Sequence, residues 1–284
     1  MQGQRLGLLV PPRSAAVLGK PVGHSLSPVL HRAAYRALGL TGWRYTAIEC
    51  DEPELAGLLA RSGTDVVGYS CTMPLKRQVL RVATSASPAA SAIGAGNTLL
   101  RTANGWHADN TDWIGIRDAL AAASVPAAGR VVVLGAGGTA QAALAALTDG
   151  EPPRQVQVLV REPGRAGELL ATASRLALPV TVAPLADPQP WLAADLVIST
   201  LPAGAADGYA GWAFTAGQAL LDAVYSPWPT PLAAAFTAAG APVISGAAML
   251  LYQAARQVEL MTGSAAPVEA MRAALRAALP GCAA

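Results

Sequence analysis

The 284-residue sequence contains few charged residues and no dense cluster of them. Charged side chains make up 13% of the chain, and 20 Lys and Arg against 18 Asp and Glu leave a formal net charge of +2 at pH 7. No run of Lys or Arg occurs, so the sequence lacks the cationic surface that a nucleic acid backbone requires. We therefore expect no nucleic acid partner.

Long uninterrupted apolar runs are also absent, although hydrophobic residues make up 52% of the chain. The nearest approach to a membrane span, residues 131–147, is interrupted by Gly135, Gly137 and Gly138, and it is more typical of a strand, a turn and a helix. Residues 1–14 contain too short an apolar segment for a secretory signal. We expect a cytoplasmic protein with no membrane partner and a loose segment over its first residues.

Cysteine and histidine are scarce, with 3 of each in the chain. Cys50, Cys71 and Cys282 are odd in number and have no metal-ligand spacing, which argues against both a disulfide framework and a zinc site. The histidines are scattered in the same way. We expect reduced, structural thiols and chemistry without a metal.

Strand-like and helix-like segments alternate from Ala15 to Ala123. The expected strands are 15–18, 44–49, 66–70 and 97–101, and the expected helices are 27–38, 54–61 and 112–123. Ser27 followed by Pro28 is typical of a helix N-cap with proline in the first turn. This alternation favours an α/β fold with a mostly parallel sheet.

A second α/β unit is expected after the helix-breaking residues 125–129. Its predicted strands are 131–134, 156–160, 196–199, 220–222 and 243–244. Residues 247–279 are almost entirely helix-forming, with interruptions at 262–263 and at Pro267. Two domains are also the better expectation for this length, because single cores stop growing at about 250–300 residues.

A glycine-rich turn follows the strand expected at 131–134 and precedes an alanine-rich segment. It has the pattern G-x-G-G-x-A, formed by Gly135, Ala136, Gly137, Gly138, Thr139 and Ala140. The first glycine permits a tight turn, the second lets the backbone approach a pyrophosphate, and the alanine allows close packing of helix on strand. The N–H groups at the start of the helix would then face the phosphates. This context predicts a dinucleotide site, and a flexible surface turn is the alternative.

The residues after the next strand bear on which dinucleotide binds. Arg161 directly follows Val160, and Arg165 comes four residues later. An arginine here can pair with the 2′-phosphate of NADP, whereas an acidic residue would bind the ribose hydroxyls of NAD. Glu162 could pair with Arg161 or accept from a ribose hydroxyl. We favour NADP over NAD, and solvated surface charges are the alternative for the two arginines.

Four polar clusters precede the glycine-rich turn, each at the end of an expected strand or the start of a helix. They are residues 19–28, 72–76, 96–98 and 109–112. Their hydroxyls and amides suit a ligand with several hydroxyl groups, and Lys76 with Asp112 could move a proton. Taken singly, each has a structural explanation: Ser27 and Asp112 as helix caps, Asn97 as a turn residue and Lys76 as a surface charge.

In this order, and ahead of this turn, the four clusters resemble the shikimate dehydrogenase family. The resemblance extends from Val17 to Gly263 and is reinforced by residues 222–232 and 245–253. It implies an N-terminal mixed α/β substrate domain, a Rossmann-type doubly wound dinucleotide-binding domain, and C-terminal helices that return to the first domain. The implied boundaries are 1–112 with 247–284 for the substrate domain, and 113–246 for the NADP-binding domain.

The resemblance implies a reversible, NADP-dependent reduction of 3-dehydroshikimate to shikimate, a step toward the aromatic amino acids. Lys76 and Asp112 match the catalytic pair. The residues that match the substrate site are Ser25, Ser27, Thr72, Asn97, Tyr225 and Gln253. The cofactor matches are the glycine-rich turn, Arg161, Ala223 and Gly246, to which the position of Arg165 adds a further candidate. We expect Lys76 to donate and accept the proton while Asp112 orients it, although either member of the pair could carry it.

The sequence departs from the family pattern at a few positions. Arg32 stands where asparagine is frequent, Ser70-Cys71 replace the usual Asn-Val, and Val160 and Glu162 replace an asparagine and a small hydroxyl residue. The alternatives to shikimate oxidation are a relative that acts on quinate or an aminated analogue and could use NAD, and a dinucleotide sensor without catalysis. We expect a homodimer or a monomer.

Overall fold

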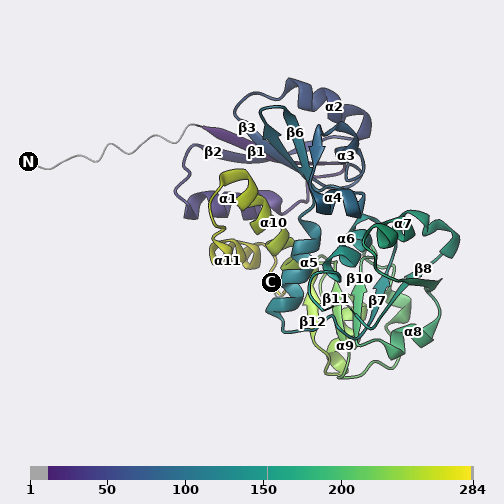
Figure 1. Cartoon of the computed structure of the whole chain (residues 1–284). Coiled ribbons are helices and arrows are strands. Elements are labelled where there is room, and N and C mark those ends of the chain that lie inside the picture. The colour runs from purple at the N-terminus through teal and green to yellow at the C-terminus, as the bar shows by residue number, and fades with distance from the viewer. Residues whose placement is uncertain (1–11, 152, 283–284) are drawn as a thin grey trace, which may run out of the picture.

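The computed structural model of the chain describes residues 12–151 and 153–282. Within these residues two separate six-stranded sheets lie one above the other, with helices between and around them (Figure 1). The expected loose N-terminal segment falls almost entirely on residues 1–11, outside the described residues. The prediction of two α/β units is confirmed.

The first sheet is mixed in direction. Its spatial order is β2 (Trp43–Glu49), β1 (Arg13–Gly19), β3 (Val66–Cys71), β5 (Thr98–Thr102), β6 (Gly105–Asp109) and β4 (Ser85–Ala86). Strand β1 is parallel to both neighbours, but β5 runs antiparallel to β3 and to β6. The prediction of a mostly parallel sheet is confirmed, because β5 alone of the six strands described for this sheet runs against the others. The signal for the reversal at β5 was Asn104-Gly105 at the β5–β6 connection, a dipeptide typical of tight hairpins.

The central strand of the first sheet, β1, is covered on both faces. Ala16 and Leu18 of β1 pack toward one core, while Ala15 and Val17 pack toward the other, as the two-residue period of a strand requires. The first core is covered by α2 (Glu52–Arg61) and α3 (Gln78–Val82), and the second by α1 (Ser27–Ala37) and α10 (Gly246–Thr262). Helix α4 (Pro88–Ile93) lies at the edge that faces the second unit (Figure 1).

The second sheet is parallel throughout. Its order is β12 (Val243–Ser245), β11 (Ala219–Asp222), β10 (Leu196–Ser199), β7 (Arg130–Leu134), β8 (Gln155–Val160) and β9 (Thr181–Pro184). The chain starts in the middle, at β7, builds outward to β9, and then crosses to β10 on the other side. This reversal between β7 and β10 is the switch point at which doubly wound sheets bind their ligands. The Rossmann-type expectation is confirmed.

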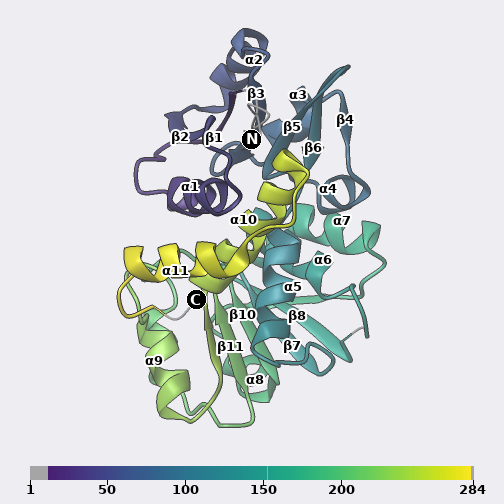
Figure 2. The same cartoon turned by 90° about the vertical axis from the view of Figure 1, so that its left-hand side faces the viewer.

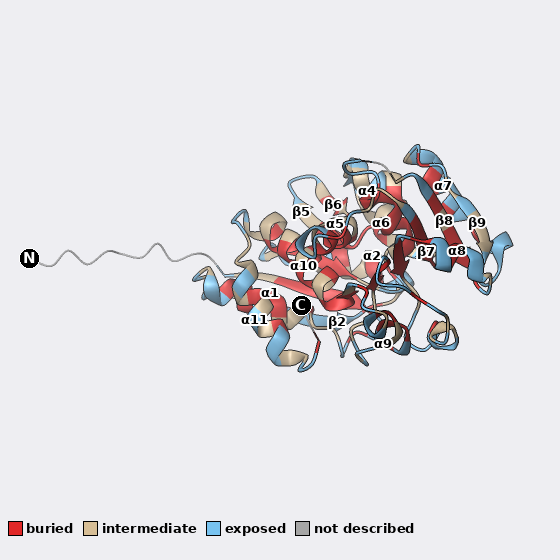
Figure 3. Cartoon of the chain, turned by 90° about the horizontal axis from the view of Figure 1, so that it is seen from below, coloured by how far each residue is buried: buried red, intermediate tan, exposed pale blue. Residues whose placement is uncertain are grey.

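Helices cover both faces of the second sheet. One face packs against α5 (Asp112–Ala122), α6 (Gly138–Ala146), α7 (Gly167–Arg175) and the start of α10. The other face packs against α8 (Pro188–Ala193) and α9 (Pro231–Ala238). Two short 3₁₀ turns, η1 (Pro163–Arg165) and η2 (Asp207–Tyr209), complete the unit. Apart from the edge strand β9, the strands of this sheet are largely buried, and the outer faces of the helices are exposed (Figure 3).

Helices α5 and α10 pack against each other between the two sheets (Figure 2). Gly115 makes this close approach possible, because a Cβ atom there would lie 2.6 Å from the Met249 carbonyl oxygen. Helix α11 (Val268–Ala278) packs on α1, with Met271 and Leu275 in the same core as Leu30. The C-terminal helices thus return to the first sheet, as expected.

The start of α1 differs in detail from the prediction. Ser27 is the first helical residue, Leu26 occupies the N-cap position, and the Ser25 hydroxyl accepts from the Ser27 N–H at 3.3 Å. The prediction of Ser27 as the N-cap is wrong by one position. Its side chain is therefore not needed to cap the helix.

Candidate active site

A pocket of about 340 Å³ lies between the two units, where α5 and α10 meet the ends of β1 and β3. Every residue predicted for catalysis or substrate binding lines it: Ser25, Ser27, Thr72, Lys76, Asn97, Asp112, Tyr225 and Gln253. These residues come from both halves of the chain. The fold therefore brings the separate polar clusters to one place.

Lys76 and Asp112 form an ion pair inside this pocket, with 2.6 Å between Nζ and Oδ2. Lys76 lies in the turn after β3, and the Gly96 N–H holds that turn by donating to the Lys76 carbonyl oxygen at 2.7 Å. Asp112 is the first residue of α5, and its carboxylate therefore also faces the positive end of that helix. The Lys76 side chain is 22% exposed and that of Asp112 is 7% exposed, so water reaches the ammonium more readily than the carboxylate.

Asp112 is held by a second side chain as well. Asn97, directly before β5, donates from Nδ2 to the Asp112 Oδ1 at 2.8 Å. The Asn110 Oδ1 accepts from the Asp112 backbone N–H at 2.9 Å. Both carboxylate oxygens thus have a donor on the protein, and their orientation is fixed. A helix cap and a turn residue would not need these side-chain contacts, so the structural explanations of Asp112 and Asn97 are insufficient.

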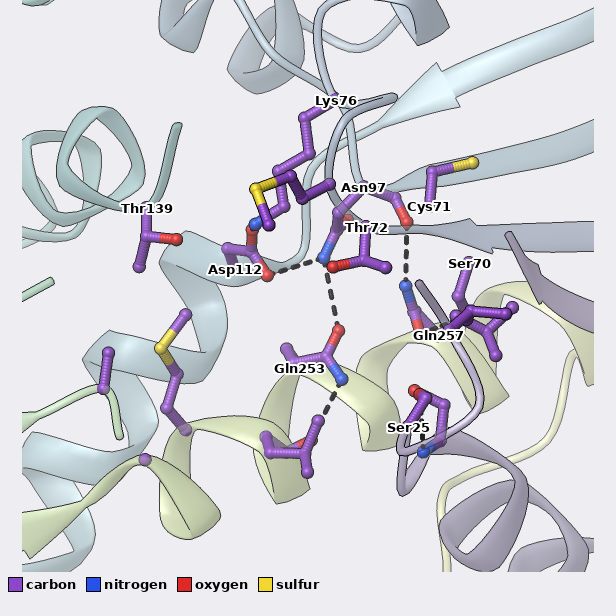
Figure 4. A pocket seen from close by; sticks show the side chains of 18 of the residues that line it. Ser25, Ser70, Cys71, Thr72, Lys76, Asn97, Asp112, Thr139, Gln253 and Gln257 are labelled. Carbon is purple, nitrogen blue, oxygen red and sulfur yellow. Dashed lines mark hydrogen bonds and ion pairs between the residues drawn. The ribbon is translucent and has the colours of Figure 1, made fainter. Parts of the chain in front are cut away.

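Gln253 reaches the same group of residues from α10. Its Oε1 lies 3.2 Å from the Asn97 Nδ2, and its Nε2 donates to the Leu250 carbonyl oxygen at 3.0 Å (Figure 4). Tyr225, in the loop after β11, lines the pocket beside it, and burial raises the pKa of its hydroxyl. Contacts from α10 and from the loop after β11 mean that the second half of the chain contributes to the wall of this pocket.

The glycine-rich turn has the geometry expected of a phosphate cradle. Gly135 has a φ of +100°, which L side chains rarely adopt, and a Cβ atom there would meet the Thr200 hydroxyl at 2.8 Å. A Cβ atom on Gly137 would meet nothing within 4 Å, so the backbone is open to a ligand at that point. Helix α6 then begins at Gly138 with Gly137 as its N-cap. Unpaired N–H groups at such a helix start bind phosphates.

The turn lies next to the proton-handling pair. A Cβ atom on Gly138 would lie 3.4 Å from the Lys76 Cδ, and Thr139 lines the same pocket as Asp112. Ala223 and Gly246, two further predicted cofactor residues, also line it. Gly135, Ala136, Gly137, Gly138 and Ala140 are not among its lining residues. A dinucleotide in the cradle would thus have a direct route to the pocket.

Arg161 and Arg165 lie outside the pocket, beyond the end of β8, and both are exposed. Glu162 forms an ion pair with Arg165 at 3.4 Å. It does not pair with Arg161, which the sequence had left as one of its two possible partners. No ion pair between Arg161 and another described residue is present. Arg161 is therefore the more available of the two cations.

Sequence reasoning missed some residues that line the pocket. Gln257 is buried and follows Gln253 by one helical turn on α10, so two glutamines four residues apart on a largely apolar helix were the signal. Met249 lies one turn before Gln253 on the same helix. Ser70 also lines the pocket, although the sequence marked it only as a departure from a pattern.

The described part of the chain contains neither a metal-binding cluster of side chains nor a membrane-spanning helix. Within residues 12–151 and 153–282, no group of three or more His, Cys, Asp or Glu side chains is placed to hold a metal ion. None of the helices in those ranges has the length and apolar character needed to span a bilayer.

Comparison with known proteins agrees with this geometry. Residues 17–99 match a family model described as the shikimate dehydrogenase substrate binding domain, and residues 246–276 match the shikimate 5′-dehydrogenase C-terminal domain. A shikimate dehydrogenase (NADP(+)) of Halobacterium salinarum is 40% identical over 271 residues, which cover 93% of this chain and 98% of the relative. The chain belongs to the shikimate dehydrogenase family.

Solved members of the shikimate dehydrogenase family share the whole fold. The shikimate dehydrogenase of Mycobacterium tuberculosis is 46% identical with a TM-score of 0.86, over 94% of this chain and 100% of that one. The shikimate 5-dehydrogenase of Thermus thermophilus, solved in complex with NADP(H) and shikimate, is 33% identical with a TM-score of 0.81, over 94% and 100% of the two chains.

Proposed function

We propose that this chain catalyses the reversible, NADP-dependent reduction of 3-dehydroshikimate to shikimate. The observation that carries the proposal is the Lys76–Asp112 ion pair, which lies in the pocket between the two units, beside the glycine-rich turn. Membership of the shikimate dehydrogenase family and the ligands named for the Thermus relative support the same reaction.

Lys76 is the proposed proton donor. When a ketone is reduced, negative charge grows on its oxygen, and a cationic donor beside that oxygen lowers the barrier. The Lys76 ammonium faces the pocket and donates one hydrogen to the Asp112 Oδ2, with 2.6 Å between Nζ and Oδ2, so its other hydrogens can face the substrate oxygen. The exposed part of Lys76 lets solvent restore the proton. Asp112 is the proposed orienting group, since both of its oxygens are already bound.

The remaining polar residues are proposed to bind the substrate. The Ser25 and Ser27 hydroxyls, at the N-terminal end of α1, are proposed to bind the carboxylate, which the positive end of that helix also favours. Thr72, Asn97, Tyr225 and Gln253 are proposed to surround the ring and its hydroxyls. A set of donors and acceptors of this kind selects for a polyhydroxylated ligand by leaving no buried partner unpaired.

The residues of the glycine-rich turn are proposed to hold NADP. Gly135 and Gly137 form the cradle, the N-terminus of α6 faces the pyrophosphate, and Ala140 packs the helix on the sheet. Arg161, with Arg165 beside it, is proposed to bind the 2′-phosphate, and Ala223 and Gly246 to border the nicotinamide. When bound, the reduced cofactor supplies the hydride.

The domain assignment and the setting remain proposals of the same kind. We propose residues 1–112 with 247–284 as the substrate domain and 113–246 as the NADP-binding domain, which fits the two sheets and the position of α10. We propose that the enzyme works in the cytoplasm, in line with the buried thiols of Cys50 and Cys71, neither of which forms a disulfide. A homodimer or monomer, and no nucleic acid partner, stay predictions.

Steady-state oxidation of shikimate, quinate and aminoshikimate, each with NADP and with NAD, tests the proposal. We expect the highest kcat/KM for shikimate with NADP. Faster turnover of quinate or aminoshikimate, or a preference for NAD, would transfer the assignment to that substrate or cofactor. Binding of a dinucleotide without turnover of any of the three acids would indicate a sensor and would refute the enzyme proposal.

A further inference from the structure

A buried chain of hydrogen bonds runs from Tyr45 of β2 to Asp112 along one wall of the proposed active site, where Ser70 and Gln257 line the pocket. The Tyr45 hydroxyl donates to the Ser70 Oγ at 2.6 Å, and the Ser70 hydroxyl donates to the Gln257 Oε1 at 2.7 Å. The Gln257 Nε2 donates to the Thr98 Oγ1 at 2.8 Å. Each of these side chains is at most 4% exposed, so water does not compete for the bonds.

The second part of the chain ends on the carboxylate. The Thr98 hydroxyl donates to the Asn97 Oδ1 at 2.8 Å, and the Asn97 Nδ2 donates to the Asp112 Oδ1 at 2.8 Å. Figure 4 shows Gln257 on the Asn97 carbonyl oxygen and Asn97 on Asp112. All donors therefore point the same way, from the hydroxyl of Tyr45 to the group that holds Lys76.

Backbone groups dictate the orientation of both amides in this chain. The Gln257 Nε2 also donates to the Asn97 carbonyl oxygen at 3.1 Å, and a carbonyl can only accept, so the NH₂ end of Gln257 must face β5. The Thr111 N–H donates to the Asn97 Oδ1 at 2.8 Å, so the NH₂ end of Asn97 must face Asp112. With both of its hydrogens used, Gln257 presents only its oxygen to Ser70.

We propose that Gln257 is a positioning residue that acts through Thr98 and Asn97 to fix the Asp112 carboxylate, and thereby Lys76, for proton transfer. This inference rests on the proposed function. Gln257 makes no hydrogen bond to Lys76 or Asp112; its effect is to anchor Asn97 from behind, at both its backbone carbonyl and, through Thr98, its side chain. Without that anchor, the Asn97 carbonyl oxygen keeps only the Cys71 N–H as donor, at 2.7 Å, and the Thr98 hydroxyl loses the donor that directs it toward the Asn97 Oδ1, so Asn97 is held less firmly.

The neighbouring titratable groups do not change charge over the pH range of an assay. His31 stacks on Tyr45 with ring centroids 4.0 Å apart, and burial lowers the pKa of His31 to about 3. Burial raises the pKa of Tyr45 well above its usual value. A change in the pH profile of the enzyme on substitution of Gln257 would thus arise from the Lys76–Asp112 pair at the other end of the chain.

Gln257→Met is the test, because it keeps the length of the side chain and removes its hydrogen bonds. We expect kcat to fall about tenfold, in line with one or two lost hydrogen bonds in the transition state, with KM for NADP unchanged. We also expect the pH profile of kcat/KM to change, because the pair that handles the proton is then held by fewer hydrogen bonds.

Gln218→Met is the matched control. Gln218 is 4% exposed and also makes three bonds, to the Trp191 and Ala194 carbonyl oxygens and from the Thr215 N–H, but it lies outside the pocket. We expect a similar loss of thermal stability with unchanged kcat and pH profile. Equal kinetic effects of the two substitutions would overturn the proposal, because they would reveal a general loss of stability.

Thr98→Val serves as a second variant if Gln257→Met folds poorly. It removes the hydroxyl between Gln257 and Asn97, so it should reproduce the kinetic change, and Thr98→Ser should recover most of the lost rate. A wild-type enzyme that oxidises none of the three acids would refute the proposed function instead. In that case, a crystal structure of Gln257→Met tests whether Gln257 positions Asn97 and Asp112. Unchanged positions of the Asn97 and Asp112 side chains would overturn the positioning role of Gln257.

Discussion

Replacing Lys76 with methionine separates the chemical role of the pair from its structural role. The two charges are 2.6 Å apart, which corresponds to an attraction of about 6 kcal/mol at an effective dielectric constant of 20, before the cost of desolvation. The loss of one partner from a fully buried pair costs about 3–5 kcal/mol, and the 22% exposure of Lys76 places this pair lower, at about 2–3 kcal/mol. Lys76→Met should lower the free energy of unfolding by that amount.

The catalytic effect of Lys76→Met should be of similar or larger size. Loss of a general acid costs about 10²–10⁴ in rate, or roughly 3–5 kcal/mol of transition-state stabilisation. KM for shikimate should change little, because Ser25, Ser27 and Gln253 stay in place. Urea unfolding measures the first quantity, and initial rates of NADPH formation measure the second.

Adding Asp112→Asn to Lys76→Met completes a double-mutant cycle. The double variant should regain part of the lost stability, since no buried charge is left unpaired, but its kcat should stay near that of Lys76→Met because the two residues act as one unit. A kcat of Lys76→Met within a few-fold of wild type would remove Lys76 from proton transfer. Strictly multiplicative losses in kcat would show that Asp112 acts independently of it.

Three further predictions concern other parts of the molecule. Gly115→Ala places a Cβ atom 2.6 Å from a carbonyl oxygen of α10 and should cost about 1–3 kcal/mol of stability in thermal unfolding. Gly167→Ala is the control, because a Cβ atom there meets nothing within 4 Å, and it should be neutral or stabilising. Equal effects of the two substitutions would contradict the close approach of α5 and α10. Arg161→Ala should weaken the binding of NADP, measured by calorimetry, and leave the binding of NAD unchanged. Arg165→Ala should weaken NADP binding by a smaller factor, because Arg165 already pairs with Glu162. Equal losses of affinity for both dinucleotides would exclude the contact of Arg161 with the 2′-phosphate. Burial lowers the pKa of His31 to about 3, below the roughly 6.5 of an unfolded chain, so its neutral ring adds stability that is complete above about pH 6.5 and is lost as the pH falls toward 3. Gln257 lies near the His31 ring, but neither ring nitrogen has a hydrogen bond of good geometry to a described residue, so His31→Phe should be tolerated at pH 7. The substitution should reduce the slope of the unfolding free energy against pH, on the acid side, by up to about 1.4 kcal/mol per pH unit. An unchanged slope would contradict this.

Local patterns in the sequence were sufficient for five of the six strands of the second sheet. Five of its strands are short apolar runs with clear borders, and the glycine-rich turn after Leu134 has few other interpretations in that context. The first sheet was harder to predict, because the direction of β5 depends on the β5–β6 hairpin and not on its own residues. The β9 strand was missed since its residues, such as Thr181 and Pro184, give no apolar run.

The candidate site shows the same division. Ser25, Thr72 and Lys76 lie in compact motifs that can be read directly, whereas Gln257 and Ser70 acquire meaning only as partners across 187 positions of the chain. A buried glutamine on a helix has no local signal that distinguishes packing from positioning. The cap role predicted for Ser27 failed because a one-residue shift in where a helix starts is decided by its tertiary contacts.

The sequence by itself determined the types of chemical group, their order and the turn that can hold phosphates, because these depend on residue identity and short-range geometry. Only the tertiary structure decided that Lys76 contacts Asp112, that Glu162 pairs with Arg165, and that Asn97 is anchored from behind by α10. Such contacts depend on how helices α5 and α10 pack between two sheets, and that packing follows from the burial of side chains distributed along the whole chain.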